Sequence, residues 1–251
     1  MKATLKNVFL WLSLLAGSYA ASAQTSLTSD GKYFLFKNYT TQNGLLQNSI
    51  YSIAQDRDGY IWIGSNVGLT RFDGKTFFHK AIPAIFNNLA TVHYIETAPD
   101  GNIICTSIMQ GVFVQQDNGQ FKQYLKRGYV ELGKNVFWSV KYCPDGRILA
   151  HESRCIYLLT TDTLQQFYDL GRDGALFHSI EMDKENRIWF GGRMGLGVMQ
   201  LSDSVYEPVF LPEFKDKLIV KILFDDEGTL HVGTSQGYYR IKWRQPYQMG
   251  Q

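Results

Sequence analysis

A repeat with a nearly constant period constrains the fold of this chain more than any other feature, because a fixed period of 20–50 residues indicates a repeat architecture. Five similar segments begin at Ile50, Val92, Phe137, Phe177 and Ile219, at successive spacings of 42, 45, 40 and 42 residues. Each is rich in β-branched and aromatic residues, which favour strands. Each leads to a residue suited to a tight turn: Gly59, Gly101, Gly146, Asn186 or Gly228. The pattern predicts hairpins at a regular interval.

Each period holds four predicted strands. The second strands are predicted at 60–64, 102–106, 147–151, 187–191 and 229–233. The third strands begin near Gly68, Gly111, Cys155, Gly195 and Gly237, and fourth strands are predicted at 76–80, 121–125, 164–168 and 205–210. Four short antiparallel strands in a period near 40 are typical of β-propeller blades. We therefore predict an all-β propeller of about five four-stranded blades over residues 24–251, with repeats at about 50–91, 92–136, 137–176, 177–218 and 219–251.

The two ends of the repeat region each contain an incomplete set of strands. Residues 32–40 resemble a fourth strand, because Asp30-Gly-Lys-Tyr-Phe34 is similar to Asp73-Gly-Lys-Thr-Phe77. The last repeat has strands one to three and only nine residues after Lys242. If 32–40 completes the last blade, the ring closes with no exposed sheet edge. The alternative is that these are the first five blades of a larger, incomplete propeller.

The N-terminus has the pattern of a secretory signal peptide over residues 1–23. Lys2 and Lys6 precede an apolar run, and Ala21-Ser-Ala23 is a small-residue cleavage site. We therefore expect an exported protein, periplasmic or extracellular after cleavage near Ala23. Removing the two leader lysines from the 25 basic residues leaves 23, equal to the 23 acidic residues. This balance argues against nucleic acid as a partner.

The amino-acid sequence of the first repeat resembles the two-component regulator propeller repeat. The match consists of Ile53-Ala-Gln-Asp-Arg-Asp-Gly-Tyr-Ile-Trp-Ile-Gly64 followed by Gly68-Leu-Thr-Arg-Phe-Asp-Gly74. Residues 177–195 and 219–237 follow it well, and 38–49 resemble the family's lead-in to its first blade. The resemblance implies an exported sensor region that precedes a membrane helix and a histidine kinase. Neither follows in these 251 residues, which leaves either a truncated or split sensor or a free-standing propeller. We expect the first, because Trp243-Arg-Gln-Pro-Tyr247 has the pattern of chain that enters another strand.

Residues that invite a catalytic or metal role have simpler interpretations. Asp56-Arg-Asp-Gly59 and Asp225-Asp-Glu-Gly228 begin like calcium loops but lack the remaining ligands, so a turn role is favoured. Trp62 and Trp189 align with Ile104, Leu149 and His231, which predicts packing at blade interfaces and makes His231 a packed histidine. The three cysteines fit no zinc spacing. The chain has no nucleophile-elbow or phosphate-loop motif, so we expect no enzyme activity, no cofactor and no metal.

The candidate binding residues lie at the predicted channel mouth, where the first strands begin and the loops between strands two and three open. The second residues of the first strands are Tyr51, His93, Trp138, His178 and Val220. The loops add Asn66, Gln110, Arg154, Arg193 and Gln236. Aromatic faces beside amide and guanidinium donors suit a sugar or another polar solute, but these aromatics could equally plug the channel.

Three classes of function remain open at this point. The first is a binding module that recognises an extracellular solute, including a carbohydrate, or a partner sensor domain, with a homodimer formed through a parent sensor. The second is implied by the resemblance of the Gly-x-Ile-Trp strands to those of propeller lyases that act on a small cyclic substrate. That resemblance makes His93 and His178 the candidates to work with a divalent ion. The third is a structural propeller that serves as a spacer or dimerisation platform.

Overall fold

The computed structural model describes residues 24–27, 33–80, 82, 91–107, 110–126, 137–169, 176–201 and 208–242. It divides into two compact units, residues 1–45 and 46–251. The predicted leader, 1–23, lies outside the described residues. The described part contains no helix of the length and apolar character needed to cross a membrane.

The second unit consists of antiparallel sheets built from consecutive strands, four with four strands and one with three. The first sheet contains β3 (Ile50–Gln55), β4 (Ile61–Ser65), β5 (Gly68–Phe72) and β6 (Phe77–Lys80). The second contains β7 (Val92–Thr97), β8 (Ile103–Ser107), β9 (Gly111–Gln115) and β10 (Phe121–Tyr124). The third contains β11 (Ser139–Tyr142), β12 (Ile148–His151), β13 (Cys155–Leu159) and β14 (Leu164–Asp169).

The remaining sheets follow the same order. The fourth contains β15 (Phe177–Met182), β16 (Arg187–Gly192), β17 (Gly195–Gln200) and β18 (Val209–Phe210). The fifth contains β19 (Ile219–Phe224), β20 (Thr229–Thr234) and β21 (Gly237–Lys242). Two short 3₁₀ turns, Thr41–Asn43 and Pro212–Phe214, complete the regular structure. The predicted five-bladed all-β architecture is confirmed, and each sheet is called a blade below.

The turns between the first and second strands form as their sequences predict. Gly59, Gly101, Gly146 and Gly228 have φ between +78° and +87°. Asn186 takes the same place in the fourth blade with φ +58°. Asn tolerates this left-handed conformation better than most residues that carry a Cβ, so the one departure from glycine keeps the turn.

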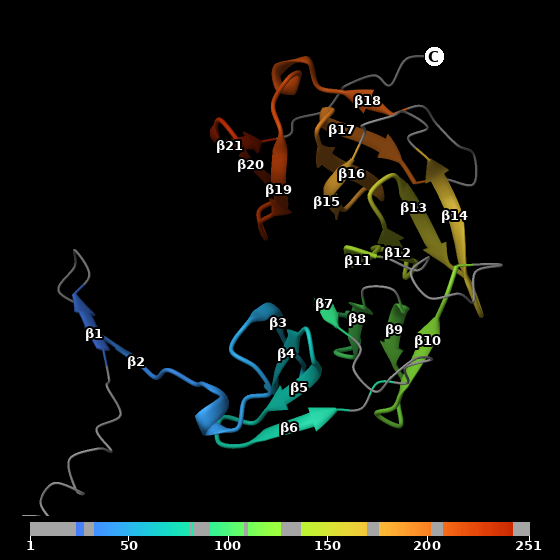
Figure 1. Cartoon of the computed structure of the whole chain (residues 1–251). Helices are drawn as coiled ribbons and strands as arrows, with labels where there is room; N and C mark the ends of the chain where they lie inside the picture. Colours follow the sequence, from blue (N-terminus) through green and yellow to red (C-terminus); the bar gives the residue numbers. More distant parts are fainter. Residues whose placement is uncertain are drawn as a thin grey trace, which may run out of the picture. The chain divides into compact units, whose positions relative to one another are not determined.

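The blades lie side by side around a common centre, with their first strands innermost (Figure 1). These strands are in contact in the order β3, β7, β11, β15 and β19. A separate apolar core fills each interface between successive blades. The interface between the first two blades, for example, contains Trp62 and Leu69 from one blade and Val92 and Ile95 from the next. Each blade therefore depends on its neighbours for burial.

Two repeat glycines permit this close packing of blades. A Cβ on Gly64 would come within 2.8 Å of Val92 in the next blade, and one on Gly191 within 2.3 Å of Ile219. Any larger side chain would push these blades apart. The glycines at the end of the second strand are thus explained by the approach of the following blade.

The first unit contains a two-stranded antiparallel sheet of β1 (Gln24–Leu27) and β2 (Tyr33–Phe36). The predicted strand at 32–40 is therefore present in part, with β1 on one of its edges. Closure of the ring by pairing of this segment with β21 stays a prediction.

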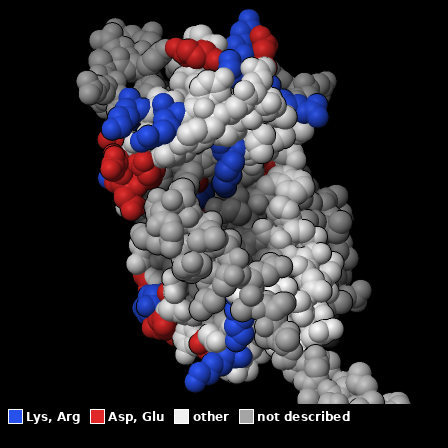
Figure 2. Space-filling model, turned by 90° about the vertical axis from the view of Figure 1, so that its left-hand side faces the viewer, with Lys and Arg blue, Asp and Glu red and all other residues white. Residues whose placement is uncertain are grey.

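Charged side chains of both signs are mixed on the surface. On the face in Figure 2, blue Lys and Arg lie beside red Asp and Glu in the same groups. This distribution agrees with the balanced charge of residues 24–251.

Candidate functional site

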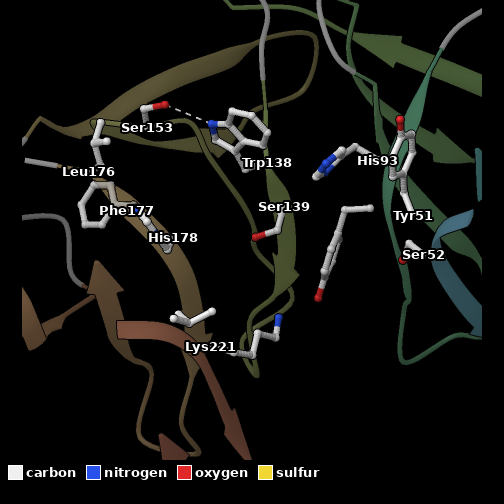
Figure 3. Close-up of a pocket in the computed structure, with 12 residues that line it drawn as sticks. Tyr51, Ser52, His93, Trp138, Ser139, Ser153, Leu176, Phe177, His178 and Lys221 are labelled. Atoms are coloured by element: carbon white, nitrogen blue, oxygen red, sulfur yellow. Dashed lines mark hydrogen bonds between the residues drawn. The ribbon is translucent and has the colours of Figure 1, made fainter. Parts of the chain in front are cut away.

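A cavity of about 520 Å³ lies where the first strands of the five blades meet. Figure 3 shows its lining, with Trp138 and His93 at the top of the view and Lys221 at the bottom. The lining residues from the first strands and their starts are Tyr51, Ser52, His93, Tyr94, Trp138, Ser139, Phe177, His178, Val220 and Lys221, and Ser153 and Leu176 complete it. The volume is in the range of small-molecule sites.

Positions along the first strands are counted here from the repeat starts at Ile50, Val92, Phe137, Phe177 and Ile219. The second residue of every repeat lines this cavity, as the sequence predicted, and Trp138 does so from just before β11. In four of the blades the register of strand pairing shifts at that residue, so Tyr51, His93, His178 and Val220 have no direct partner on the second strand. Such a bulge adds one residue to a strand and redirects its side chain. Bulging at a repeated position therefore brings side chains from successive blades to one opening.

Three of these side chains form a continuous aromatic wall. The rings of Tyr51 and His93 stack with centroids 5.2 Å apart, and the His93 and Trp138 rings meet edge to face at 5.3 Å. The indole N–H of Trp138 donates to Ser153 Oγ at 3.0 Å, which fixes the ring plane. Trp138 keeps 37% of its surface exposed. The wall is thus suited to stacking against a flat or ring-shaped ligand.

The third residues of the first strands link neighbouring blades, line the cavity, or do both, as Ser52 does. Ser52 Oγ accepts from the backbone N–H of Ile95 at 3.0 Å, and Ser179 Oγ accepts from that of Ile222 at 3.2 Å. These serines link neighbouring blades. Tyr94 and Lys221 occupy the corresponding position in the second and fifth blades and line the cavity.

A charged layer spans the middle blades at the fifth residue of the first strands. Lys141 Nζ lies 2.9 Å from Glu96 Oε2 and 2.9 Å from Glu181 Oε1, and all three side chains are largely buried. Burial opposes the Lys141 charge, but the two carboxylates raise the pKa of Lys141 above its usual value. Burial raises the pKa of Glu181. This layer was not predicted from the sequence, although Glu96, Lys141 and Glu181 stand at one position of successive repeats and could have indicated it.

Tyr94 connects the charged layer to the cavity. Its hydroxyl donates to Glu96 Oε2 at 3.2 Å, and the Lys141 amino group lies 5.7 Å from the centre of its ring. Burial raises the pKa of Tyr94 to about 12. The phenol is therefore neutral and its hydroxyl is hydrogen-bonded to Glu96. The ring is the part of Tyr94 available to contact a ligand in the cavity.

The predicted loop residues do not line the cavity. Gln110 is buried, and its carbonyl accepts from the side chain of Gln123. Asn66, Arg154, Arg193 and Gln236 are exposed, and Arg154 lies 3.4 Å from Asp169. Backbone atoms of two of these loops are hydrogen-bonded: Thr91, which precedes the second blade, donates to the carbonyl of Asn66, and the N–H of Arg193 donates to the carbonyl of Leu176 at the start of its own blade. Contact of these side chains with a ligand stays a prediction.

The turn aspartates have the structural role that the sequence favoured. Asp56 accepts the backbone N–H groups of its turn and the indole N–H of Trp62 at 2.7 Å. Asp183 does the same for Trp189 at 2.8 Å. Both tryptophans are buried, which confirms their predicted packing at blade interfaces.

His231 in the fifth blade is only partly buried, so its interpretation as a packed histidine is corrected. It lies 2.8 Å from Asp225 and also bonds Tyr238. The hydrogen bond from His231 lowers the pKa of Asp225 to about 2. Within the described residues, no three His, Cys, Asp or Glu side chains gather as metal ligands do.

Comparison with known proteins matches part of this chain to a repeat family and to a histidine kinase. The family model for the two component regulator propeller matches residues 44–67. Histidine kinase P4 of Formosa agariphila is 44% identical over 52 residues, which is 21% of this chain and 4% of that protein. The chain thus spans a small part of that kinase.

Solved structures share the fold at low identity. The extracellular domain of the BT3049 hybrid two component system of B. thetaiotaomicron is 20% identical with a TM-score of 0.65, over 82% of this chain and 30% of that one. Virginiamycin B lyase of Staphylococcus aureus is 17% identical with a TM-score of 0.60, over 78% and 71%. Both likenesses concern the fold alone. On the family match, residues 44–67 of this chain form a two component regulator propeller repeat.

Proposed function

We propose that this chain is the extracytoplasmic sensing or interaction propeller of a two-component signalling system, and that it acts by binding rather than catalysis. The observation that carries the proposal is the cavity of about 520 Å³ to which every blade contributes a first-strand residue. A ligand there touches five blades at once, so its binding energy depends on how the blades are arranged. Such a site can bias an arrangement of blades, as a sensor requires.

The family match and the kinase relative support the signalling part of the proposal. An exported location follows from the predicted signal peptide at 1–23 and from the likeness to an extracellular domain. The proposed ligand is a small polar solute such as a carbohydrate, or a partner sensor domain. The kinase is supplied by a longer parent chain or by assembly, which also permits a homodimer.

Replacing Trp138 with alanine tests the binding role. A buried aromatic anchor commonly contributes about 2 kcal/mol or more to binding. We expect Trp138→Ala to abolish the rise in melting temperature that a bound oligosaccharide produces, while the ligand-free melting temperature stays nearly unchanged. Differential scanning fluorimetry with a panel of neutral and acidic di- to tetrasaccharides measures both.

Phe78→Ala provides the matched control. Phe78 is as exposed as Trp138, at 40% against 37%, but lies on the outermost strand β6 and does not line the cavity. This variant should keep the full ligand response. An unfolded Trp138→Ala protein, or one with an unaltered response, removes this cavity from consideration as the binding site.

A lyase acting on a small cyclic substrate is the second candidate, favoured by one observation. His93 and His178, from the second and fourth blades, both line the cavity. An imidazole pair facing one space can take part in acid–base chemistry. Opening of a cyclic depsipeptide that requires added Mg²⁺ and is lost in His93→Ala or His178→Ala would establish this alternative, and its absence in the wild-type chain would leave the binding role.

A further inference from the structure

We propose that the cavity selects a sugar ring carrying an anionic group, a carboxylate or a sulfate ester, and that the Lys221 ammonium group binds that anion. This inference deepens the proposed binding function and rests on it. Its first ground is the lining itself. Lys221 is the one lysine or arginine among the lining residues given above, and none of them is an aspartate or glutamate.

The nearby carboxylates are already occupied by another lysine. Glu96 and Glu181 both contact Lys141 Nζ at 2.9 Å, and Glu96 also accepts from the Tyr94 hydroxyl and from the backbone N–H of Tyr142. The charged layer below the cavity is thus arranged around Lys141. It leaves Lys221 as the cation that faces the cavity.

Lys221 lacks a carboxylate within ion-pair distance among the described residues. Its amino group lies 5.5 Å from the centre of the Tyr94 ring, a cation–π contact. Desolvation by neighbouring groups and repulsion from Lys141 lower the pKa of Lys221, and attraction to Glu181 and Glu96 opposes this only in part. The side chain of Lys221 is exposed, so a ligand anion can reach its ammonium group and accept a charge-assisted hydrogen bond from it.

The rest of the lining suits the sugar ring that carries this anion. The wall of Tyr51, His93 and Trp138 offers ring faces across the cavity from Lys221 (Figure 3). Ser139 lies between these two sides and brings a hydroxyl that can donate to an anion or a sugar oxygen. Aromatic faces on one side and a cation on the other fit a ring that is apolar on its faces and charged at one substituent.

The test compares ligands that differ in charge alone. Isothermal titration calorimetry of the purified chain uses oligogalacturonides, sulfated galacto-oligosaccharides and neutral galacto-oligosaccharides of two to four units. We expect at least one acidic series to bind at least about tenfold more tightly than the neutral series, since a hydrogen bond to a charged group contributes at this level. The acidic series that binds distinguishes a carboxylate from a sulfate. Binding of that series should weaken as salt increases.

Variants of Lys221 assign the effect to this side chain. Lys221→Met should remove the preference for the acidic series, and Lys221→Arg should retain most of it. Lys184→Met is the matched control, because Lys184 lies in the turn between β15 and β16, outside the cavity lining, and its loss changes the net charge equally. The ligand-free melting temperature of Lys221→Met should change little, since the repulsion from Lys141 and the attraction to Glu181 and Glu96 are removed together.

Each alternative result overturns a defined part of the argument. Equal binding of neutral and acidic series, with Lys221→Met indifferent, overturns the anion inference and leaves the proposed binding function intact. Binding of the neutral series alone does the same. A wild-type chain that binds none of the three series overturns the inference and also counts against a saccharide as the ligand of the proposed function.

Discussion

The first blade and the blades after it differ at one position of the same repeat. Ile53, the fourth residue of the first strand, is 68% exposed, whereas its equivalents Ile95, Val140, Ile180 and Ile222 are 0–4% exposed. Those four residues pack against the preceding blade. The first blade has no preceding blade in contact among the described residues of its own unit, so its isoleucine is left uncovered.

The last blade shows the same contrast on its opposite face. Tyr238, the second residue of β21, is 61% exposed, whereas Leu69, Val112, Ile156 and Leu196 at the corresponding position are 0–1% exposed. These four pack toward the following blade. Burial at a repeat position thus depends on a neighbouring blade. The first blade is uncovered on the face that would meet a preceding blade, and the last blade on the face that would meet a following one.

The largest expected effect is at a covered face. Ile180→Ala removes a side chain that is packed against Leu149 and Ile156 of the third blade. Truncation of a buried isoleucine typically lowers the free energy of unfolding by about 2–5 kcal/mol. Urea denaturation followed by tryptophan fluorescence measures the loss. A change below about 1 kcal/mol would mean that the blades do not depend on one another for burial.

The pH dependence of the free energy of unfolding should distinguish buried His151 from partly exposed His231. His151, at the end of β12, is fully buried, and burial lowers the pKa of His151 from 6.5 to about 4. The unfolded chain therefore binds a proton between pH 6.5 and pH 4 that the folded chain does not. The contribution of neutral, buried His151 to the free energy of unfolding is therefore intact above pH 6.5. It is lost as the pH falls toward 4, by an amount on the order of 3 kcal/mol.

The measurement is the difference in stability slope between the wild-type chain and a variant. Between pH 7 and pH 4 the free energy of unfolding should fall less in His151→Gln than in the wild type, and the difference should be on the order of 3 kcal/mol. His231→Gln, at the partly exposed position in the last blade, is the control and should not show that reduction. Identical slopes for wild type and His151→Gln would show that His151 is accessible to protons in the folded state.

The smallest expected effect is at the uncovered face. Ile53→Ala should change the free energy of unfolding by about 0.5 kcal/mol or less, as is usual for an exposed side chain. The same urea denaturation provides the value. A loss as large as that of Ile180→Ala would instead show that another segment covers this face, which would support closure of the ring by residues 32–40 and the last blade.

The strands and turns could be predicted from the sequence because they follow local rules. The predicted third strands begin at Gly68, Gly111, Cys155, Gly195 and Gly237, which are the residues where the observed ones begin. Of the fourth strand predicted at 205–210, residues 205–207 lie outside the described residues, and Val209–Phe210 is observed as a strand. The alternation of β-forming runs with turn residues needs no information from distant parts of the chain.

The candidate site was predictable only in part. The repeat pattern placed Tyr51, His93, Trp138, His178 and Val220 at one opening, because equivalent positions of successive blades must face a common centre. It did not identify Tyr94 and Lys221, because the role of this position differs between blades: Ser179 hydrogen-bonds to the next blade, whereas Tyr94 and Lys221 line the cavity. It also placed Arg154 and Arg193 at the mouth, whereas these long side chains lie outside the cavity lining.

The sequence by itself therefore determined the period, the four strands of a blade, the turn residues and the position from which side chains converge. Only the tertiary structure decided which polar residue pairs with which. Lys141 lies between Glu96 and Glu181 while Lys221 does not, and this depends on how far side chains of different blades reach across a shared space. Repeat patterns specify the position of a side chain within its blade. Distances between blades, and the charge left without a partner, arise only when the blades are assembled.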